Sequence, residues 1–346
     1  MKENLLVIGA GHQGLAMAAH LAMNGEKVNI WNRSKKTIEK ICKTKHIACT
    51  GVINDVVEIK EASDCIEEVL EKVILVTTPS FAHRDIARML APIIKPDSVV
   101  ILNPGRTFGA IDFLNELKIN GCRNIPYVAE TQSIIYTCRK INEDTACIYA
   151  LKNNIKIACV NGNIADVKER IPECMRDSFS YIDSAIDTSL SNIGMILHCA
   201  PVLLNVGWIE SPIHKFEYYY DGISPSIANI LEKMDAERVN VAKKMGVKVD
   251  SLIEWFHSAY NVEGESIYEC IQNNVSYRGI DAPLSIEHRY LDEDVPNGLV
   301  PVEYLGKCLG VDVSTISQII DLANLMRGVD YRDLGRRYAP EELNKI

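Results

Sequence analysis

The sequence predicts an α/β domain followed by a mostly α-helical domain, and three observations support this fold class. First, a short apolar segment (residues 5–8) leads into a glycine-rich turn (9–14), a helical pattern and a second apolar segment (28–31). Second, apolar strand patterns alternate with helical patterns as far as about residue 180, which is typical of a parallel sheet. Third, long helical patterns replace the strand patterns near residue 187. We therefore expect two domains, residues 1–185 and 186–346.

The glycine-rich turn has the G-x-G-x-x-G spacing, with Gly9, Gly11 and Gly14 as its glycines and His12 and Gln13 between the last two. In a strand–turn–helix–strand unit this motif indicates a Rossmann dinucleotide-binding domain. The first glycine permits the tight turn, the second lets the backbone approach a pyrophosphate, and the third lets the helix pack close to the sheet. The phosphates then lie at the helix N-terminus. The alternative is a glycine turn in an ordinary βα unit.

The residues after the second strand bear on the choice of nucleotide. An NAD site usually places Asp or Glu there, against the ribose 2′-hydroxyl. This chain has Asn32, Arg33 and Ser34 instead. Arg33 can form a bidentate contact with a 2′-phosphate, and Ser34 can add a hydroxyl. The sequence therefore favours NADP(H), with NAD(H) as the second choice; the alternative is that these side chains are solvated.

Further cofactor residues are expected beyond the carboxyl ends of the later strands, where open parallel sheets bind their ligands. Thr78 and Pro79 follow the apolar strand 72–78 and are expected to form a wall of the cleft. Residues 103–106 follow the next strand and are expected near the nicotinamide. His83 is expected on a helix face and not in catalysis.

The remaining elements are expected from hydrophobic periodicity and turn residues. Strands are expected at 46–52, 56–59, 98–102 and 126–136, with a β-hairpin at 147–160 that turns at Asn153-Asn154. Helices are expected at 35–43, 62–70, 163–175, 189–206, 225–245, 249–259, 301–309 and 313–326.

Composition excludes several classes of protein. The formal net charge of −9 argues against a nucleic acid or an anionic membrane as a partner. The eleven cysteines include no C-x-x-C pair, so neither a metal site nor a disulfide framework is expected. No apolar run approaches the ~18 residues of a membrane span, and the first strand leaves no room for a signal peptide. We expect a cytoplasmic protein with reduced thiols.

Two polar clusters in the helical half are candidates for chemistry. His198 lies in an otherwise apolar helical pattern that Pro201 interrupts, and a hydrogen-bonded core histidine is as good an interpretation as a catalytic one. Residues 287–294 combine several carboxylates with Arg289, and the alternative for them is a solvated surface loop.

The chain resembles the octopine/nopaline (opine) dehydrogenase family. The matching segments are GAGHQG at 9–14, TPSFAH at 78–83, AETQSIIYTCR at 129–139, HCAPVLLNVGWIE at 198–210 and RYLDEDVPNGLVP at 289–301. They occur in the family's order over most of the chain, and the last two are the specific ones. Cys199 follows the histidine where the family's pattern has proline. This departure does not change the reactive group, which is the imidazole of His198.

The resemblance implies a reductive condensation of an amino acid with a 2-oxo acid such as pyruvate, through an imine that NAD(P)H reduces. It assigns the catalytic histidine to His198, its partner carboxylate to Asp294, the arginine for a substrate carboxylate to Arg289, and an amino-acid contact to Glu130. Asp292 and Glu293 compete for the role of Asp294, and we expect both to be solvated. A homodimer through the helical domain is also expected.

Two other functions stay open at this point. One is an NADP-dependent dehydrogenase of a hydroxy acid or a polyol phosphate, which would need no amine. The other is a non-catalytic protein that senses NADP. The sequence does not identify the amino acid or the oxo acid.

Overall fold

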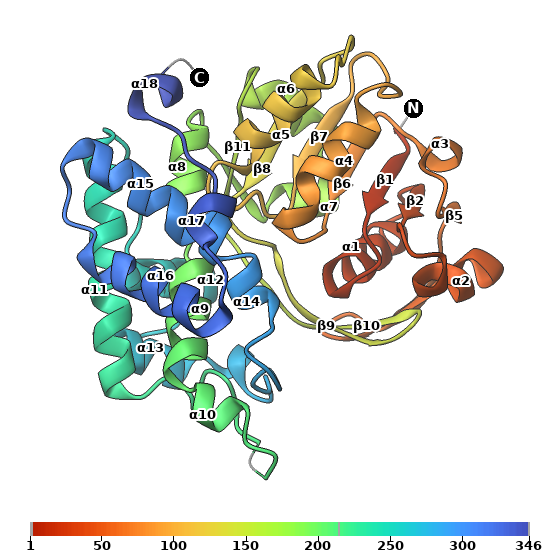
Figure 1. Ribbon diagram of the computed structural model, residues 1–346. Helices are drawn as coiled ribbons and strands as arrows, with labels where there is room; N and C mark the ends of the chain where they lie inside the picture. Colours follow the sequence, from red (N-terminus) through yellow and green to blue (C-terminus); the bar gives the residue numbers. More distant parts are fainter. Residues whose placement is uncertain (1–2, 214, 345–346) are drawn as a thin grey trace. The chain divides into compact units, whose positions relative to one another are not determined.

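The computed structural model describes residues 3–213 and 215–344, and the chain divides into two compact units. Unit 1 comprises residues 1–105 and 109–185, and unit 2 comprises residues 106–108 and 186–346. The predicted fold class is confirmed, since unit 1 is an α/β fold and unit 2 is helical (Figure 1). No helix in the described ranges combines the length and apolarity that a bilayer crossing requires.

Unit 1 is built on a twisted sheet of eight strands within the described residues, in the order β12-β11-β8-β7-β6-β1-β2-β5. All neighbouring strands run parallel except the antiparallel pair β8 and β11. The strands are β1 (Leu5–Ile8), β2 (Val28–Trp31), β5 (Glu61–Ser63), β6 (Val73–Val76), β7 (Val99–Leu102), β8 (Tyr127–Thr131), β11 (Ile155–Cys159) and β12 (Phe179–Tyr181).

The central strands are apolar on both faces because helices cover the sheet, as expected for a parallel arrangement. Val7 of β1 lies between Ile30 of β2 and Leu75 of β6, which places the carboxyl ends of these strands at one edge. The helices of unit 1 are α1 (His12–Met23), α2 (Lys35–Thr44), α3 (Ile66–Val69), α4 (His83–Leu90), α5 (Gly109–Ile119), α6 (Ile164–Arg170) and α7 (Glu173–Arg176), with a 3₁₀ turn at Ser80–Ala82.

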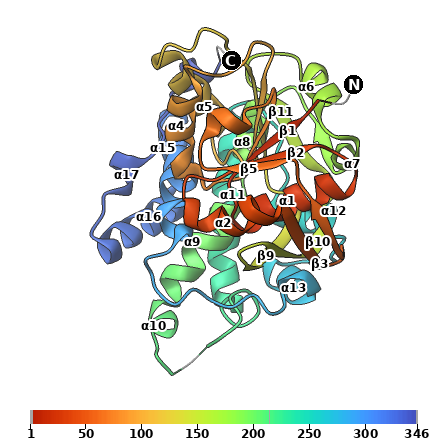
Figure 2. The same cartoon turned by 90° about the vertical axis from the view of Figure 1, so that its right-hand side faces the viewer.

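A second sheet in unit 1 packs on α1 (Figure 2). Its described strands, in the order β4-β3-β10-β9, are β4 (Asp55–Glu58), β3 (His46–Gly51), β10 (Thr145–Leu151) and β9 (Tyr136–Asn142). The hairpin expected at 147–160 is wrong. β10 pairs with β9 across a turn at residues 143–144, whereas β11 pairs with β8 in the large sheet. Residues 152–154 are therefore a link between the two sheets.

Several predicted elements are shorter in the structure because turns divide them. The expected helix 62–70 is strand β5 followed by α3, the expected strand 126–136 ends at Thr131, and Pro172 separates α6 from α7. The expected helix 189–206 is divided by residues 191–193 and again at Asn205.

Unit 2 is an assembly of helices in which α11 packs against α9, α13, α15 and α16 (Figure 1). Its helices are α8 (Ala185–Leu190), α9 (Gly194–Leu204), α10 (Val206–Ile209), α11 (Pro225–Lys244), α12 (Leu252–Tyr260), α13 (Ile267–Asn273), α14 (Arg289–Asp292), α15 (Val300–Leu309), α16 (Ser314–Arg327), α17 (Tyr331–Leu334) and α18 (Pro340–Leu343), with a 3₁₀ turn at Val275–Tyr277. A π-helical turn, η3 (Val295–Leu299), connects α14 to α15 and packs on α9.

Candidate functional site

The glycine-rich turn in unit 1 has the geometry of a dinucleotide cradle. Gly9 has a φ of +109°, which favours glycine, and a side chain on Gly14 would lie 1.8 Å from the Gly9 carbonyl oxygen. Apart from Gly11 itself and its chain neighbours, no described residue has a heavy atom within 4 Å of the position that a Cβ on Gly11 would occupy. The backbone there is open to a ligand at the N-terminus of α1, so these residues fit a pyrophosphate.

Neighbouring polar groups also fit a ligand. The hydroxyl of Thr78 and the amide oxygen of Gln13 are buried and have no hydrogen-bond partner among the described residues. Thr78 and Pro79 follow β6, and the Thr78 methyl group lies 3.1 Å from the Cβ position of Gly9. Buried polar atoms are normally satisfied, so this edge of the sheet suits a polar ligand.

The loop after β2 presents its polar side chains without a carboxylate. Asn32 accepts a hydrogen bond from the Ala10 N–H at 3.1 Å and donates to the Ser34 carbonyl oxygen, which ties the loop to the glycine-rich turn. The Arg33 side chain is 78% exposed, with the exposed Asp85 carboxylate 3.8 Å away. A solvated pair at this distance contributes little, so the guanidinium can turn toward a phosphate.

Lys140 is a cation at the glycine-rich turn that the sequence did not indicate. Its ammonium group donates to the Ala10 carbonyl oxygen at 3.0 Å, and its backbone N–H donates to Nδ1 of His12 at 2.7 Å. Lys140 lies on β9, which packs on α1, and partial burial lowers its pKa. The contact joins residues 130 positions apart, so no local pattern could reveal it.

Glu130 lies at the end of β8 in unit 1 and is almost fully buried. Its Oε2 accepts a hydrogen bond from the Ala110 N–H at 2.7 Å, in the first turn of α5. A Cβ on Gly105 would lie 2.2 Å from the same oxygen, so only glycine fits there. The substrate contact assigned to Glu130 stays a prediction. His83, at the start of α4, is buried with Nε2 3.3 Å from the Thr78 carbonyl oxygen.

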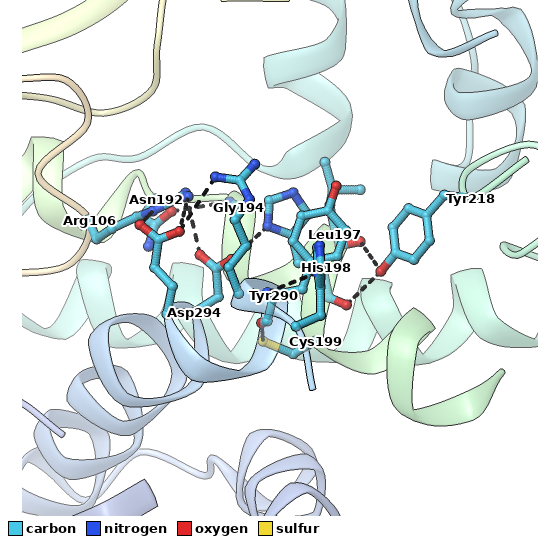
Figure 3. A network of polar contacts seen from close by, with 12 residues as sticks. Arg106, Asn192, Gly194, Leu197, His198, Cys199, Tyr218, Tyr290 and Asp294 are labelled. Atoms are coloured by element: carbon cyan, nitrogen blue, oxygen red, sulfur yellow. Dashed lines mark hydrogen bonds and ion pairs between the residues drawn. The ribbon is translucent and has the colours of Figure 1, made fainter. Parts of the chain in front are cut away.

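In unit 2, the imidazole of His198 contacts the carboxylate of Asp294 (Figure 3). Nδ1 and Oδ2 are 2.7 Å apart, and the two side chains are 14% and 0% exposed. An ionised carboxylate only accepts hydrogen bonds, so Nδ1 carries the proton and Nε2 is the basic nitrogen. Burial lowers the pKa of His198 below 6.5; Asp294 acts in the opposite direction, and Arg106 and Arg289 add to the lowering. Burial therefore favours the neutral form of the imidazole.

Aromatic and backbone contacts hold the imidazole in place. The Tyr290 ring stacks on it at a centroid distance of 4.0 Å and an angle of 12°. Pro201 has no N–H, so it cannot form the helical hydrogen bond to the carbonyl oxygen of Leu197. The Tyr218 hydroxyl lies 3.5 Å from that oxygen, and it donates to the carbonyl oxygen of His198 at 2.7 Å (Figure 3).

Cys199, the departure from the family's pattern, has a structural contact. Its thiol is buried and donates to the Tyr290 carbonyl oxygen at 3.4 Å. This contact connects α9 to α14, the helix that carries Arg289 and leads into Asp294. The departure is thus accommodated at the junction of the two helices.

Asp294 and Glu293 both bind a buried arginine, Arg106, which the sequence only places in the loop 103–106 that is expected near the nicotinamide. Nη1 of Arg106 lies 3.4 Å from Oδ1 of Asp294, and Nε and Nη2 donate to the two oxygens of Glu293 at 3.2 and 3.3 Å. The expectation that Glu293 is solvated is wrong, because its side chain is 2% exposed. The chain between α14 and η3 turns both carboxylates inward. Asp292 remains partly exposed and accepts from the Tyr331 hydroxyl.

Arg289 lies at the edge of this network. Its side chain is 38% exposed, and Nη1 lies 3.8 Å from Oε2 of Glu293. Imidazole, two carboxylates and two guanidinium groups therefore form a continuous polar network, with Arg289 as its more exposed cation. A weak acid–base group beside a cation that can bind an anion is suited to proton transfer on a carboxylate-bearing substrate.

Two family models match the chain. Residues 181–327 match the α-helical domain of NAD/NADP octopine/nopaline dehydrogenases, and residues 4–105 match the N-terminus of NAD-dependent glycerol-3-phosphate dehydrogenase. The second match covers the nucleotide-binding part alone and carries no information on the substrate.

Known proteins resemble the chain over nearly its full length. The opine dehydrogenase of Arthrobacter sp. (strain 1C) is 33% identical over 343 residues, which cover 95% of this chain and 92% of that protein. Among solved structures, octopine dehydrogenase with NADH and pyruvate has a TM-score of 0.76 at 15% identity, covering 98% of this chain and 95% of that one. NADP⁺-bound yersinopine dehydrogenase has a TM-score of 0.75 at 14% identity, covering 97% and 93%. These structures show the shared fold.

Proposed function

The chain belongs to the opine dehydrogenase family, and on this premise we propose that it is an NADPH-dependent enzyme that condenses an amino acid with a 2-oxo acid of the pyruvate type. As a member of the family it is an NAD(P)-dependent oxidoreductase. The proposed product is an N-(carboxyalkyl) amino acid. The observation that carries the proposal is the 2.7 Å contact between His198 and Asp294, in a network that also contains Arg289.

The neutral state of His198 suits the first proton transfer. Its Nε2 accepts a proton from the ammonium group of the amino acid, which frees the amine to add to the carbonyl carbon of the oxo acid. The adding nitrogen gives one proton to the former carbonyl oxygen, and the imidazolium gives the second. That oxygen leaves as water, and an iminium group remains.

Asp294 and Arg289 have different roles in this scheme. The carboxylate of Asp294 holds the productive tautomer and stabilises the imidazolium while it carries the proton. The guanidinium of Arg289 binds the carboxylate of the oxo acid bidentately and sets the position of its carbonyl group. When bound, the reduced nucleotide supplies the hydride that reduces the iminium carbon.

For the nucleotide, we propose that residues 1–185 form the binding domain and that residues 186–346 provide the catalytic groups. Gly9, Gly11 and Gly14 would admit the pyrophosphate, with His12 and Gln13 at the start of α1 and Thr78 and Pro79 beside it. A preference for NADPH is supported by Asn32 in place of a carboxylate, by the exposed guanidinium of Arg33 and by the adjacent Ser34. The similar solved structures include both NADH and NADP⁺ complexes, so they do not decide the preference.

The test is a screen of NADPH oxidation by the purified full-length chain. Pyruvate and other 2-oxo acids are combined with each common amino acid, and products are identified by mass. We expect oxidation that requires both substrates and is lost in His198→Gln. Oxidation with an oxo acid alone would instead indicate a hydroxy-acid dehydrogenase. Nucleotide binding without turnover across the panel would indicate a nucleotide-sensing protein.

We also propose that the enzyme works in the cytoplasm as a homodimer through its helical domain. All eleven cysteines lie in the described ranges and are free thiols, which supports a reducing compartment. Size-exclusion chromatography with light scattering tests the dimer.

A further inference from the structure

A tripeptide that follows β7 belongs to unit 2 and has a strained backbone. Residues 106–108 follow Gly105, and Arg106 and Phe108 have φ values of +63° and +59°. Residues with side chains rarely adopt this conformation, and it persists only where the surroundings hold it. The Thr107 N–H donates to the Asn297 carbonyl oxygen, and the Phe108 N–H donates to the Ser189 hydroxyl, both at 3.0 Å.

Further contacts fix this tripeptide against α9. The Arg336 guanidinium donates to the Thr107 carbonyl oxygen at 2.9 Å. Asn192 donates to the Thr107 hydroxyl at 3.2 Å. Asn192 also accepts from the Gly194 N–H at 3.1 Å (Figure 3). Gly194 is the first residue of α9, one helical turn before His198. The backbone that carries Arg106 is thus tied to the helix that carries the imidazole.

The guanidinium of Arg106 fills a space that α9 leaves open for it. A Cβ on Gly194 would lie 2.5 Å from Nη1 of Arg106, so a side chain there would displace the arginine. The guanidinium is buried, and its burial opposes the charged form, but the carboxylates of Asp294 and Glu293 raise the pKa of Arg106, so it stays charged. Arg106 is therefore a permanent cation beside Asp294, the carboxylate that binds the imidazole of His198.

Asp294 therefore divides its two oxygens between two partners, the imidazole of His198 and the guanidinium of Arg106. Oδ2 accepts from His198 and Oδ1 faces Arg106, while Arg106 also binds Glu293, which in turn lies beside Arg289. We propose that Arg106 is a positioning residue that fixes the Asp294 carboxylate for His198 and connects it, through Glu293, to the cation that binds the oxo acid. This rests on the proposed function, and it assigns to Arg106 a role that acts through Asp294 and Glu293.

The arrangement has a consequence for the proton affinity of the imidazole. The charged groups that face His198 are Asp294, Arg106 and Arg289, and the neutral titratable groups around it are Tyr218, Tyr290 and Cys199. With Arg106 in place, the negative charge of Asp294 acts on both the guanidinium and the imidazole. The neutral imidazole is then favoured in the absence of substrate. Without Arg106, Asp294 acts on the imidazole alone, so the pKa of His198 should rise.

The experiment compares full-length Arg106→Lys and Arg106→Met with Arg332→Met as the matched control. Arg332 also pairs with a buried carboxylate in unit 2, that of Glu303, but it has no contact with His198 or Asp294. The His198 resonance in isotope-labelled protein, assigned with His198→Gln, is followed through pH without ligands. Turnover against pH and NADPH binding by fluorescence are measured alongside.

We expect an upward shift of the His198 pKa in Arg106→Met. The shift should be smaller in Arg106→Lys, because lysine keeps the positive charge but lacks the planar guanidinium that contacts both carboxylates. The value of kcat should fall roughly a hundredfold and tenfold, respectively, with unchanged NADPH binding. Arg332→Met should leave both the titration and kcat unchanged. If Arg106→Met does not fold, Arg106→Lys decides. A wild-type titration and kcat in Arg106→Lys would overturn the proposal.

The two proposals fail in different ways. If no amine-dependent turnover is found in the wild-type protein, the proposed function is wrong. The titration of His198 needs no substrate and still decides whether Arg106 sets the state of the imidazole.

Discussion

Asp294→Asn removes one charge from the buried network and keeps the number of non-hydrogen atoms in the side chain. In the structure, Oδ2 of Asp294 accepts from Nδ1 of His198 and Oδ1 faces Arg106. An amide at this position can donate to Nδ1, which would place the imidazole proton on Nε2. The nitrogen that should accept the substrate proton would then carry one already.

The size of the effect follows from these contacts. Losing the tautomer and the imidazolium partner should lower kcat roughly 10²–10⁴-fold, which is about 3–5 kcal/mol of transition-state stabilisation. Folding stability should fall by about 3 kcal/mol, the lower end for breaking a buried ion pair, because Arg106 keeps both contacts to Glu293. The value of kcat should therefore fall by a far larger factor than the fraction of protein that is folded.

The assay is steady-state NADPH oxidation at saturating amino acid and oxo acid, with unfolding followed in urea. Asp292→Asn is the control, since Asp292 is two positions away, partly exposed and bound to Tyr331. It should change kcat by no more than a few-fold. The role assigned to Asp294 is refuted if Asp294→Asn keeps a kcat within a few-fold of the wild type, as Asp292→Asn is expected to do.

The pH dependence of the reverse reaction gives a second test of the same residue. On the proposed function, oxidation of an opine needs neutral His198 as a base, so the rate should fall as the pH drops through the pKa of His198. Burial holds that pKa below 6.5, and Asp294 works against this lowering. Removing the Asp294 charge should therefore move the midpoint of the residual activity to a still lower pH, and a shift to higher pH would contradict this assignment.

Three further predictions concern binding. Arg33→Ala should raise the Kd for NADPH at least tenfold and leave that for NADH nearly unchanged, measured by nucleotide fluorescence; equal effects would refute the 2′-phosphate contact. Lys140→Met should weaken NADH and NADPH binding equally, because the ammonium group lies at the glycine-rich turn; an effect on NADPH alone would place it at the 2′-phosphate. Arg289→Lys should raise the KM for the oxo acid more than that for the amino acid in initial-rate kinetics, and an unchanged KM would remove Arg289 from carboxylate binding.

Local signals were sufficient to predict the fold class, whereas the contact between His198 and Asp294 was predicted only from the family resemblance. The turn at Gly9 and the close approach at Gly14 impose constraints that only glycine meets, so the motif is visible in sequence order. The pairing of His198 with Asp294 was predicted from the resemblance to the family's motifs, and the two side chains lie 2.7 Å apart in the structure. Their catalytic roles stay predictions.

Non-local contacts explain what could not be predicted. The turn residues Asn153-Asn154 looked like a hairpin, but strand pairing is decided across the sheet, and β10 and β11 have different partners. The sequence does not distinguish Glu293 from Asp292, because both are carboxylates in one polar segment and both were expected to be solvated. Its burial depends on Arg106, which lies 187 positions earlier in the chain. No local pattern encodes such a pair.

The charges of the network suggest why the resting imidazole is neutral and how it becomes an acid. Arg106 and Arg289 balance Glu293 and Asp294, so a neutral His198 leaves the network without net charge. On the proposed function, the carboxylate of the oxo acid binds Arg289 and adds one negative charge beside this balance. A proton on His198 then restores neutrality, and in a buried site this favours the imidazolium strongly. Binding of the anionic substrate would therefore favour the imidazolium form of His198, which is the proton donor. Without substrate, the imidazole would stay neutral.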